Sequence, residues 1–235
     1  NAVPDGGLLF VGPSWSVRHV GSFAANTVQD AVILGNRGTS GIDGCVSTAW
    51  GAATALQRNG GAGAIALMGD QTFLYDSNGL LAPAEEERPD LVIVVSDNDG
   101  GGIFSSLEQG APEHAATFER VFGVPLGIDV AALSTALGFP VVVAATASEL
   151  TAAIEDAVGI GGVRIVVART CAREREAEIL VNVQRAVGQQ LTTEGFGIRV
   201  SGCPVMTDTY ASDGRAVAEK ALGTLLCALA GIDIA

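Results

Sequence analysis

The chain has 235 residues, of which 48% are hydrophobic, and its formal net charge at pH 7 is −13. We expect no nucleic-acid partner, because phosphate backbones are bound by clustered Lys and Arg, whereas the only Lys in this sequence is Lys220. The four cysteines show no C-x-x-C spacing, and we expect them to be reduced thiols of a cytoplasmic protein. The sequence has no apolar stretch of about 18 residues and no basic leader, so we expect neither a membrane span nor a signal peptide.

Six short apolar runs, each bounded by glycine or polar residues, predict β-strands. They cover residues 8–11, 32–34, 64–68, 91–95, 140–143 and 164–168. Helices are predicted through residues 17–20 and over 45–56, 72–81, 129–137, 149–158 and 174–187, with short helices in 103–126. We expect Asp129 and Ser148 to cap the helices that follow them. Strands that alternate with helices predict an α/β fold, with a six-stranded parallel sheet and helices on both faces.

The two ends of the chain depart from this pattern. Residues 1–7 are interpreted as a linker, residues 8–190 as the domain, and residues 191–235 as a C-terminal extension of unknown role. Within the extension, residues 192–213 show no clear period, and 215–229 predict one apolar helix. Because the sequence starts without Met, we expect it to be part of a longer polypeptide.

Polar turns follow two neighbouring predicted strands. Asp70 follows the third strand, and Asn98 follows the fourth, just before a run of three glycines that starts at Gly100. Ligands of open parallel sheets bind beyond the carboxyl ends of the strands, so Asp70 and Asn98 should face each other across one crevice. A carboxylate, an amide oxygen and a carbonyl of the glycine turn suit Mg²⁺ or Mn²⁺. Backbone N–H groups of Gln71 and Thr72, at a predicted helix start, would meet phosphate groups.

Each of these turns also has an ordinary interpretation. A Gly-Asp pair after a strand is often only a turn and a helix cap, and a triple glycine is often only a turn. A Rossmann site would require G-x-G-x-x-G in the first strand–helix turn, and the run at Gly100 lacks that spacing. The two turns together, each after a strand, favour the metal site.

Three segments carry a resemblance to a known family. Residues 36–44, 69–80 and 98–104 read NRGTSGIDG, GDQTFLYDSNGL and NDGGGIF. The Gly-Asp and Asn positions resemble the thiamine-diphosphate motif of a decarboxylase and synthase superfamily. The complete sequences of the three segments resemble 2-succinyl-5-enolpyruvyl-6-hydroxy-3-cyclohexene-1-carboxylate synthase, an enzyme of menaquinone biosynthesis. The likeness covers roughly residues 7–190 and corresponds to the C-terminal, thiamine-diphosphate-binding domain of that enzyme.

The resemblance implies roles for the cofactor site. Its metal ligands are Asp70, Asn98 and the carbonyl of Gly100. Other implied cofactor contacts are Gly69, Gln71, Thr72, Ile42 and Ile103. Ile42 would be the wedge that holds the two cofactor rings in a bent shape, and its alternative is an ordinary core position. Asp97 stands where the usual pattern has a first Asn, and it adds a negative charge near the diphosphate unless its side chain points away.

The resemblance also implies a substrate site. Ser14, Arg18 and Arg37 would bind substrate carboxylates, chiefly the distal one of a 2-oxo diacid. An Arg guanidinium suits this role because it can donate two parallel hydrogen bonds to one carboxylate. For each Arg alone, a surface position is the alternative. An apolar wall over the thiazolium, formed by Ile103, Phe104 and Leu107, is likewise implied. These three residues and the wedge Ile42 are the predicted catalytic residues. The alternative for the three residues of the wall is a helix face against the core.

The implied activity is that of a transferase. The full enzyme would decarboxylate 2-oxoglutarate on thiamine diphosphate and add the succinyl-semialdehyde carbanion to isochorismate. A pyrimidine-binding domain that carries an activating Glu would be needed in cis or on a partner subunit, and we expect a homo-oligomer. Two alternatives stay open: a subunit of another thiamine-diphosphate 2-oxo acid decarboxylase, and a non-catalytic interaction module that kept the fold.

Overall fold

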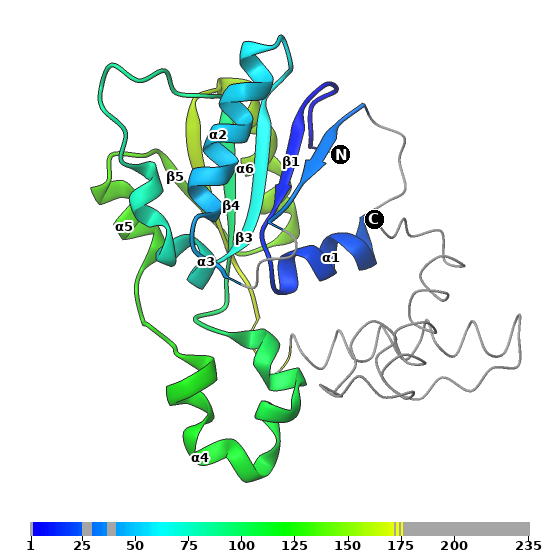
Figure 1. Ribbon diagram of the computed structural model, residues 1–235, viewed down its shortest axis with the longest axis vertical. Helices are drawn as coiled ribbons and strands as arrows, with labels where there is room; N and C mark the ends of the chain where they lie inside the picture. Colours follow the sequence, from blue (N-terminus) through cyan, green and yellow to red (C-terminus); the bar gives the residue numbers. More distant parts are fainter. Residues whose placement is uncertain (1, 25–29, 37–40, 172, 174, 176–235) are drawn as a thin grey trace, which may run out of the picture. The chain divides into compact units, whose positions relative to one another are not determined.

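The computed structural model describes residues 2–24, 30–36, 41–171, 173 and 175 (Figure 1). The chain divides into a first unit, Asn1–Gly101 with Val124–Cys171, and a second unit, Gly102–Gly123 with Ala172–Ala235. The predicted helix 174–187, but for residue 175, and the C-terminal extension lie outside the described residues. The linker and domain boundaries therefore stay predictions.

The first unit is built on one six-stranded sheet in which every neighbouring pair of strands is parallel. The strands are β1 Leu8–Val11, β2 Val32–Leu34, β3 Ala64–Gly69, β4 Leu91–Asp97, β5 Val141–Ala144 and β6 Val163–Arg169. Their order across the sheet is β2-β1-β3-β4-β6-β5. The predicted six-stranded parallel sheet is confirmed.

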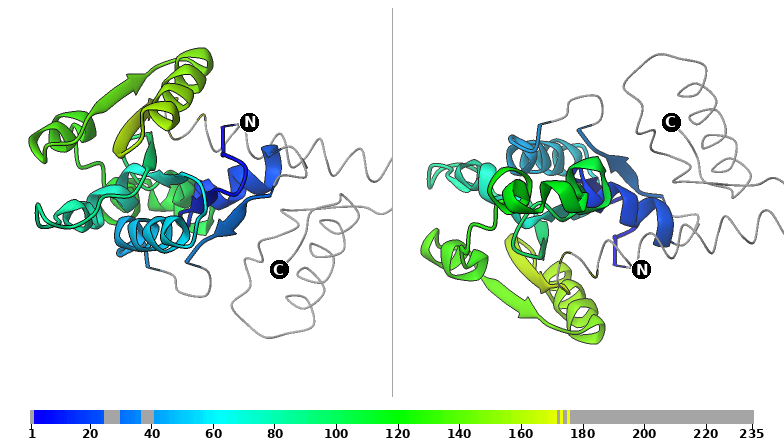
Figure 2. Two further views of the ribbon diagram at one scale, coloured as in Figure 1. Left: turned by 90° about the horizontal axis from the view of Figure 1, so that it is seen from above. Right: turned by 90° about the horizontal axis from the view of Figure 1, so that it is seen from below.

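Five α-helices of the first unit connect these strands: α1 Trp15–Phe23, α2 Cys45–Arg58, α3 Asp70–Tyr75, α5 Val130–Ala136 and α6 Ala147–Ile160. The predicted cap of α5 is confirmed, because the Asp129 carboxylate accepts the N–H groups of Ala131 and Ala132. Helices cover both faces of the sheet, as predicted: Figure 1 shows α2 and α6 on opposite sides of β3 and β4, and Figure 2 shows the same separation.

Two helix predictions were wrong in detail. The cap of α6 is Thr146 and not Ser148, because the Thr146 hydroxyl accepts the Glu149 N–H while the Glu149 carboxylate accepts the Thr146 N–H. The predicted helix 72–81 is split into α3 and a 3-10 helix at Ser77–Leu80. The break lies at Asp76, whose carboxylate accepts the backbone N–H and the hydroxyl of Ser47 in α2.

Alternation along the buried strands gives the sheet two apolar faces. One face carries the larger core cluster, in which Met68 and Ile93 meet Val46 and Ala49 of α2. The other face carries a smaller cluster, in which strand residues such as Val92 meet the small residues of α6. Residues at successive strand positions point to opposite faces, so a fully covered parallel strand is apolar throughout.

The direction of the connections changes between β1 and β3. From β1 the chain goes out to β2 at one edge, and it then returns past β1 to β3. The two strand ends lie close together here: Gly12 N–H donates to the Leu67 carbonyl, and a Cβ at Gly12 would lie 3.0 Å from the Cβ of Met68. Such a reversal leaves a crevice beyond the carboxyl ends of the strands.

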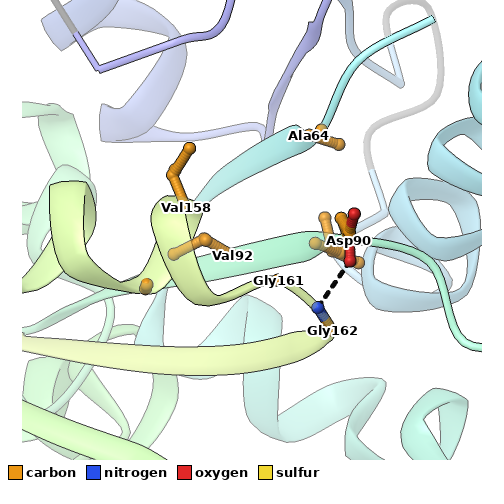
Figure 3. A pocket seen from close by; sticks show the side chains of 9 residues that line it. Ala64, Asp90, Val92, Val158, Gly161 and Gly162 are labelled. Atoms are coloured by element: carbon orange, nitrogen blue, oxygen red, sulfur yellow. Dashed lines mark hydrogen bonds between the residues drawn. The ribbon is translucent and has the colours of Figure 1, made fainter.

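The amino ends of β3 and β4 hold a small pocket (Figure 3). Asp90 lies beside it, and its carboxylate accepts the Gly162 N–H at 2.6 Å. The pocket volume of about 10 Å³ is of the order of a single water molecule. The pocket is therefore too small for a cofactor.

The described part of the second unit consists of short helical segments between Gly102 and Gly123, as predicted for this region. The longest of them have five residues, a 3-10 helix at Gly102–Ser106 and a π-helix at Glu119–Gly123. Aromatic side chains pack within the unit: the ring centroids of Phe104 and Phe122 lie 5.5 Å apart. Arg173 donates to the Glu119 carboxylate at 2.7 Å.

Candidate functional site

Asp70 lies at the carboxyl edge, as the residue that follows β3 and begins α3. Its exposed fraction is only 5%. Its Oδ2 atom accepts the backbone N–H of Gly100 at 2.7 Å, which joins the turn after β3 to the turn after β4. Within the described residues, Asp70 forms no ion pair. A buried carboxylate held by backbone donors alone is suited to a metal cation.

Burial dominates the acid–base behaviour of Asp70. Loss of solvation raises the pKa of its carboxyl group from the ordinary 3.8 to about 6. The negative charges of Asp97 and Asp99 raise it further, while hydrogen bonds from the backbone N–H groups of Gln71 and Gly100 lower it. A bound divalent cation would oppose the rise, because a positive charge favours the ionised acid.

Asn98 lies on the neighbouring turn, one residue beyond β4. The register pairs Gly69 with Ser96, so the turns that carry Asp70 and Asn98 leave the sheet side by side. The Oδ1 atom of Asn98 is buried. Asp99 has a φ of 53° and Gly100 one of 138°, a left-handed turn that brings the Gly100 N–H to Asp70. The structure thus places Asp70, Asn98 and Gly100 at one edge, while their role as metal ligands stays a prediction.

The other predicted phosphate contacts lie at the same turn. Gly69 ends β3, and a Cβ added there would meet nothing within 4 Å. Thr72 is buried at 3% exposure, and the Gln71 side chain donates to the Val124 carbonyl at 2.9 Å. The Gln71 side chain therefore fixes the start of α3 to the segment that leads to α5.

Asp97, the departure from the usual motif, forms an ion pair on the far side of β4. Its Oδ2 atom accepts from Arg169 Nη1 at 2.5 Å, and its Oδ1 atom accepts the Asp99 N–H at 3.4 Å. Its side chain is 6% exposed, whereas that of Arg169 is 45% exposed. We did not expect Arg169 at the site. Its position at the end of the sixth predicted strand, on the same edge, was the one signal for it.

Two of the predicted substrate residues lie at the end of β1. Ser14 has a φ of 72°, which is strained for a residue with a side chain, and it immediately precedes α1. The Ser14 carbonyl accepts from Arg18 Nη1 at 2.8 Å, so the structure brings these two residues together. Arg37, the third predicted member, lies outside the described residues.

The apolar residues of the prediction are divided between the two units. Ile42 is half-buried in the turn before α2 and belongs to neither core cluster among the described residues. Ile103, Phe104 and Leu107 are half-buried in the second unit, where Phe104 packs on an aromatic neighbour. Their proposed roles as wedge and apolar wall stay predictions.

The geometry defines a class: a parallel α/β domain with a buried acid, an amide and a glycine turn at the carboxyl edge of its sheet. The family model "Thiamine pyrophosphate enzyme, C-terminal TPP binding domain" matches residues 15–168, and the chain belongs to this family. Thiamine pyrophosphate is another name for thiamine diphosphate.

Curated relatives carry the name that the sequence motifs indicated. A 2-succinyl-5-enolpyruvyl-6-hydroxy-3-cyclohexene-1-carboxylate synthase of Saccharopolyspora erythraea is 48% identical over 165 residues, 70% of this chain and 29% of that protein. The protein of the same name from Thermobifida fusca is 46% identical over 79% of this chain and 32% of its own length. The resemblance is confirmed, and the chain spans about a third of the length of these relatives.

A solved structure supports the fold. The chain matches a thiamine diphosphate-dependent 4-hydroxybenzoylformate decarboxylase of Rhodococcus jostii with a TM-score of 0.51 and 21% identity, over 74% of this chain and 31% of that one.

Of the helices that the structure describes, none has the length and apolar character needed to cross a membrane.

Proposed function

We propose that this chain is the diphosphate- and Mg²⁺-binding domain of a thiamine-diphosphate-dependent carboligase. In this proposal the complete cytoplasmic, homo-oligomeric enzyme decarboxylates 2-oxoglutarate and transfers the remaining four-carbon unit to isochorismate, a step of menaquinone biosynthesis. The observation that carries the proposal is the buried Asp70 carboxylate, joined by the Gly100 N–H to the turn that carries Asn98. The names of the relatives support the substrates.

The donor set fits a hard divalent cation. Asp70 supplies a carboxylate, and Asn98 supplies a buried amide oxygen. Gly100 supplies a backbone carbonyl, and its N–H donates to Asp70. An ion pair to Asp70 is missing within the described residues, so the charge of the ionised acid is left to a bound cation. Mg²⁺, or Mn²⁺ in its place, would complete its coordination with diphosphate oxygens and water.

The remaining residues of this domain would bind and orient. Bound thiamine diphosphate supplies the carbanion chemistry, and the protein supplies position and electrostatics. Gly69, Gln71 and Thr72 would border the diphosphate, and Ile42 would support the rings. Ser14, Arg18 and Arg37 would bind the distal carboxylate of 2-oxoglutarate, and Ile103, Phe104 and Leu107 would exclude water. A pyrimidine-binding domain, in cis or on a partner subunit, would supply the activating Glu.

Product analysis with the complete enzyme tests the proposal. Incubation with thiamine diphosphate, Mg²⁺ and 2-oxoglutarate should give the carboligation product with isochorismate present. Decarboxylation of pyruvate in preference to 2-oxoglutarate would instead favour another 2-oxo acid decarboxylase. Calorimetry with thiamine diphosphate and Mg²⁺ is the second measurement, and a complete enzyme that binds neither would favour the non-catalytic module.

A further inference from the structure

We propose that Arg169 is a positioning residue for the metal-binding turn. Its guanidinium holds the Asp97 carboxylate toward β6, so that the acid next to Asn98 is turned away from the cofactor diphosphate. This inference rests on the proposed function, in which Asp70 and Asn98 hold a divalent cation and that cation holds a diphosphate.

Arg169 joins three segments of the first unit. Its Nη1 atom contacts Asp97 Oδ2 at 2.5 Å, and its Nη2 atom lies 3.7 Å from the Oδ1 atom of Asp129, the cap of α5. The next residue fixes the backbone at the same place, because the Asp97 carbonyl accepts both the N–H and the hydroxyl of Thr170, each at 3.1 Å. The main chain and the side chain of Asp97 are therefore both held by the end of β6.

The acid on the other side of Asn98 is held in a similar way. Asp99 Oδ1 accepts the backbone N–H of Gly127 at 3.0 Å. In the turn after β4, Asp97 and Asp99 thus stand on either side of Asn98. Each of these two carboxylates accepts a hydrogen bond from a later part of the chain. Among the donors that the described residues provide, Arg169 is the charged one, and it neutralises the Asp97 carboxylate.

The charge of Asp97 explains why this neutralisation matters. The side chain of Asp97 is 6% exposed, and water screens a buried carboxylate poorly. Removal of one partner from a buried pair leaves an uncompensated charge. Without Arg169, that charge would repel a diphosphate at the neighbouring turn, while it would not weaken the attraction for a cation.

The experiment uses the complete enzyme and measures the Kd of thiamine diphosphate at saturating Mg²⁺. Arg169→Met should weaken cofactor binding about tenfold, the size of one uncompensated charge in a partly solvated site. Asp97→Asn in the Arg169→Met background should restore the Kd to within about threefold of the parent, because the repelling charge is gone. Arg58→Met removes an equal charge from a side chain that is 63% exposed in α2, and it should leave the Kd unchanged.

Two further measurements separate positioning from a general structural role. Arg169→Lys keeps a positive charge beside Asp97 and should stay within about threefold of the parent Kd, since the closest contact uses a single nitrogen. Mg²⁺ alone, followed by its effect on the melting temperature, should bind the Arg169→Met protein no more weakly than the parent. The Lys variant also provides a folded protein for the comparison if the Met variant does not fold.

The outcomes are distinct. If Arg169→Met binds thiamine diphosphate like the parent, or if Asp97→Asn fails to rescue it, the role of Arg169 is overturned while the proposed function stands. A loss in Arg169→Lys as large as in Arg169→Met, or an equal loss of Mg²⁺ binding, also overturns it. If the parent enzyme binds no thiamine diphosphate, the proposed function fails and the inference fails with it.

Discussion

Asp70 is a buried acid whose charge is costly for the stability of the folded protein. The acid is 5% exposed, and burial raises its pKa to about 6. Two backbone donors partly offset the loss of solvation, but in the described structure no basic side chain does. A neutral residue at this position would avoid the cost of burying a charge, so the buried acid supports the proposed cation site.

Asp70→Asn should therefore stabilise the metal-free protein at pH 7.5. The folded pKa of about 6 exceeds the ordinary 3.8, so protonation favours the folded state, fully below about pH 3.8, and this stabilisation is lost as the pH rises through 6. The neutral amide keeps the acceptor for Gly100 without the charge. We expect a gain of about 1–3 kcal/mol in urea unfolding at pH 7.5, and a smaller gain at pH 4.5.

The same variant should lose the melting-temperature increase that Mg²⁺ gives the parent protein. Asp5→Asn is the matched control, because Asp5 is an exposed acid near the opposite end of β1. A variant that is stabilised and still responds to Mg²⁺ would show that Asp70 is buried for another reason.

Mg²⁺ affinity should also depend on pH through Asp70. A metal ligand must be deprotonated, so protons compete with Mg²⁺ once the pH falls below the pKa of about 6. Between pH 6 and pH 5 we expect the affinity to fall by up to about tenfold, and above pH 7 it should be nearly constant. Calorimetric titration of the complete enzyme at several pH values measures this, and a flat profile down to pH 5 would contradict it.

At the scale of elements, the strands could be predicted from the sequence, whereas only some of the helix ends could, such as the Asp129 cap of α5. A parallel strand covered on both faces is apolar throughout, so runs such as Leu91–Val95 mark a strand to within two residues. Helix ends depend on which of several polar side chains reaches a free N–H. Thr146 and Ser148 are both good caps in isolation, and Thr146 is the cap because Glu149 completes a capping box with it.

Thr146→Ala should lower the free energy of unfolding by about 1 kcal/mol, the usual cost of losing a Thr cap. Ser148→Ala is the matched control, because Ser148 lies within the first turn of α6 and its hydroxyl contacts only the Thr146 hydroxyl, at 3.2 Å, in the described hydrogen bonds. We expect an effect below about 0.5 kcal/mol for the control. Urea denaturation of both variants decides the matter, and equal effects would mean that the capping box contributes little.

The candidate site could be predicted in part, for a related reason. Asp70 and Asn98 each follow a strand, and the carboxyl ends of parallel strands meet at one edge, so their proximity follows from the pattern alone. The pairing of Asp97 with Arg169 depends on the order of the strands: β6 lies between β4 and β5, and the two residues are 72 positions apart. A single sequence does not give strand order, so this contact was not foreseen.

At the scale of the whole molecule, the net charge of −13 is the dominant feature beyond the fold. Excess charge of one sign destabilises a compact state through self-repulsion, and salt screens that repulsion. The charge is that of all 235 residues, whereas the family match covers residues 15–168 and the chain spans about a third of the length of its curated relatives.

Sodium chloride should therefore raise the melting temperature of the chain, by a few degrees between about 0.02 and 0.3 M. Mg²⁺ should add a further increase at constant ionic strength, and only this increase should disappear in Asp70→Asn. The comparison is made by thermal unfolding with NaCl and MgCl₂ matched in ionic strength. If the two salts act alike on the parent protein, Mg²⁺ acts by screening and not at Asp70.

The place of β6 in the sheet has a consequence for synthesis on the ribosome. The hydrogen bonds and the ion pair that hold Asp97 come from residues 169 and 170, at the end of the last strand that the structure describes. The turn after β4 is complete in sequence some seventy residues earlier, but until β6 inserts beside β4 it has no partner on that side. A nascent chain that is interrupted before Arg169 would hence present the turn that carries Asn98 in an unclamped form, and at the proposed site cofactor binding would follow the synthesis of β6.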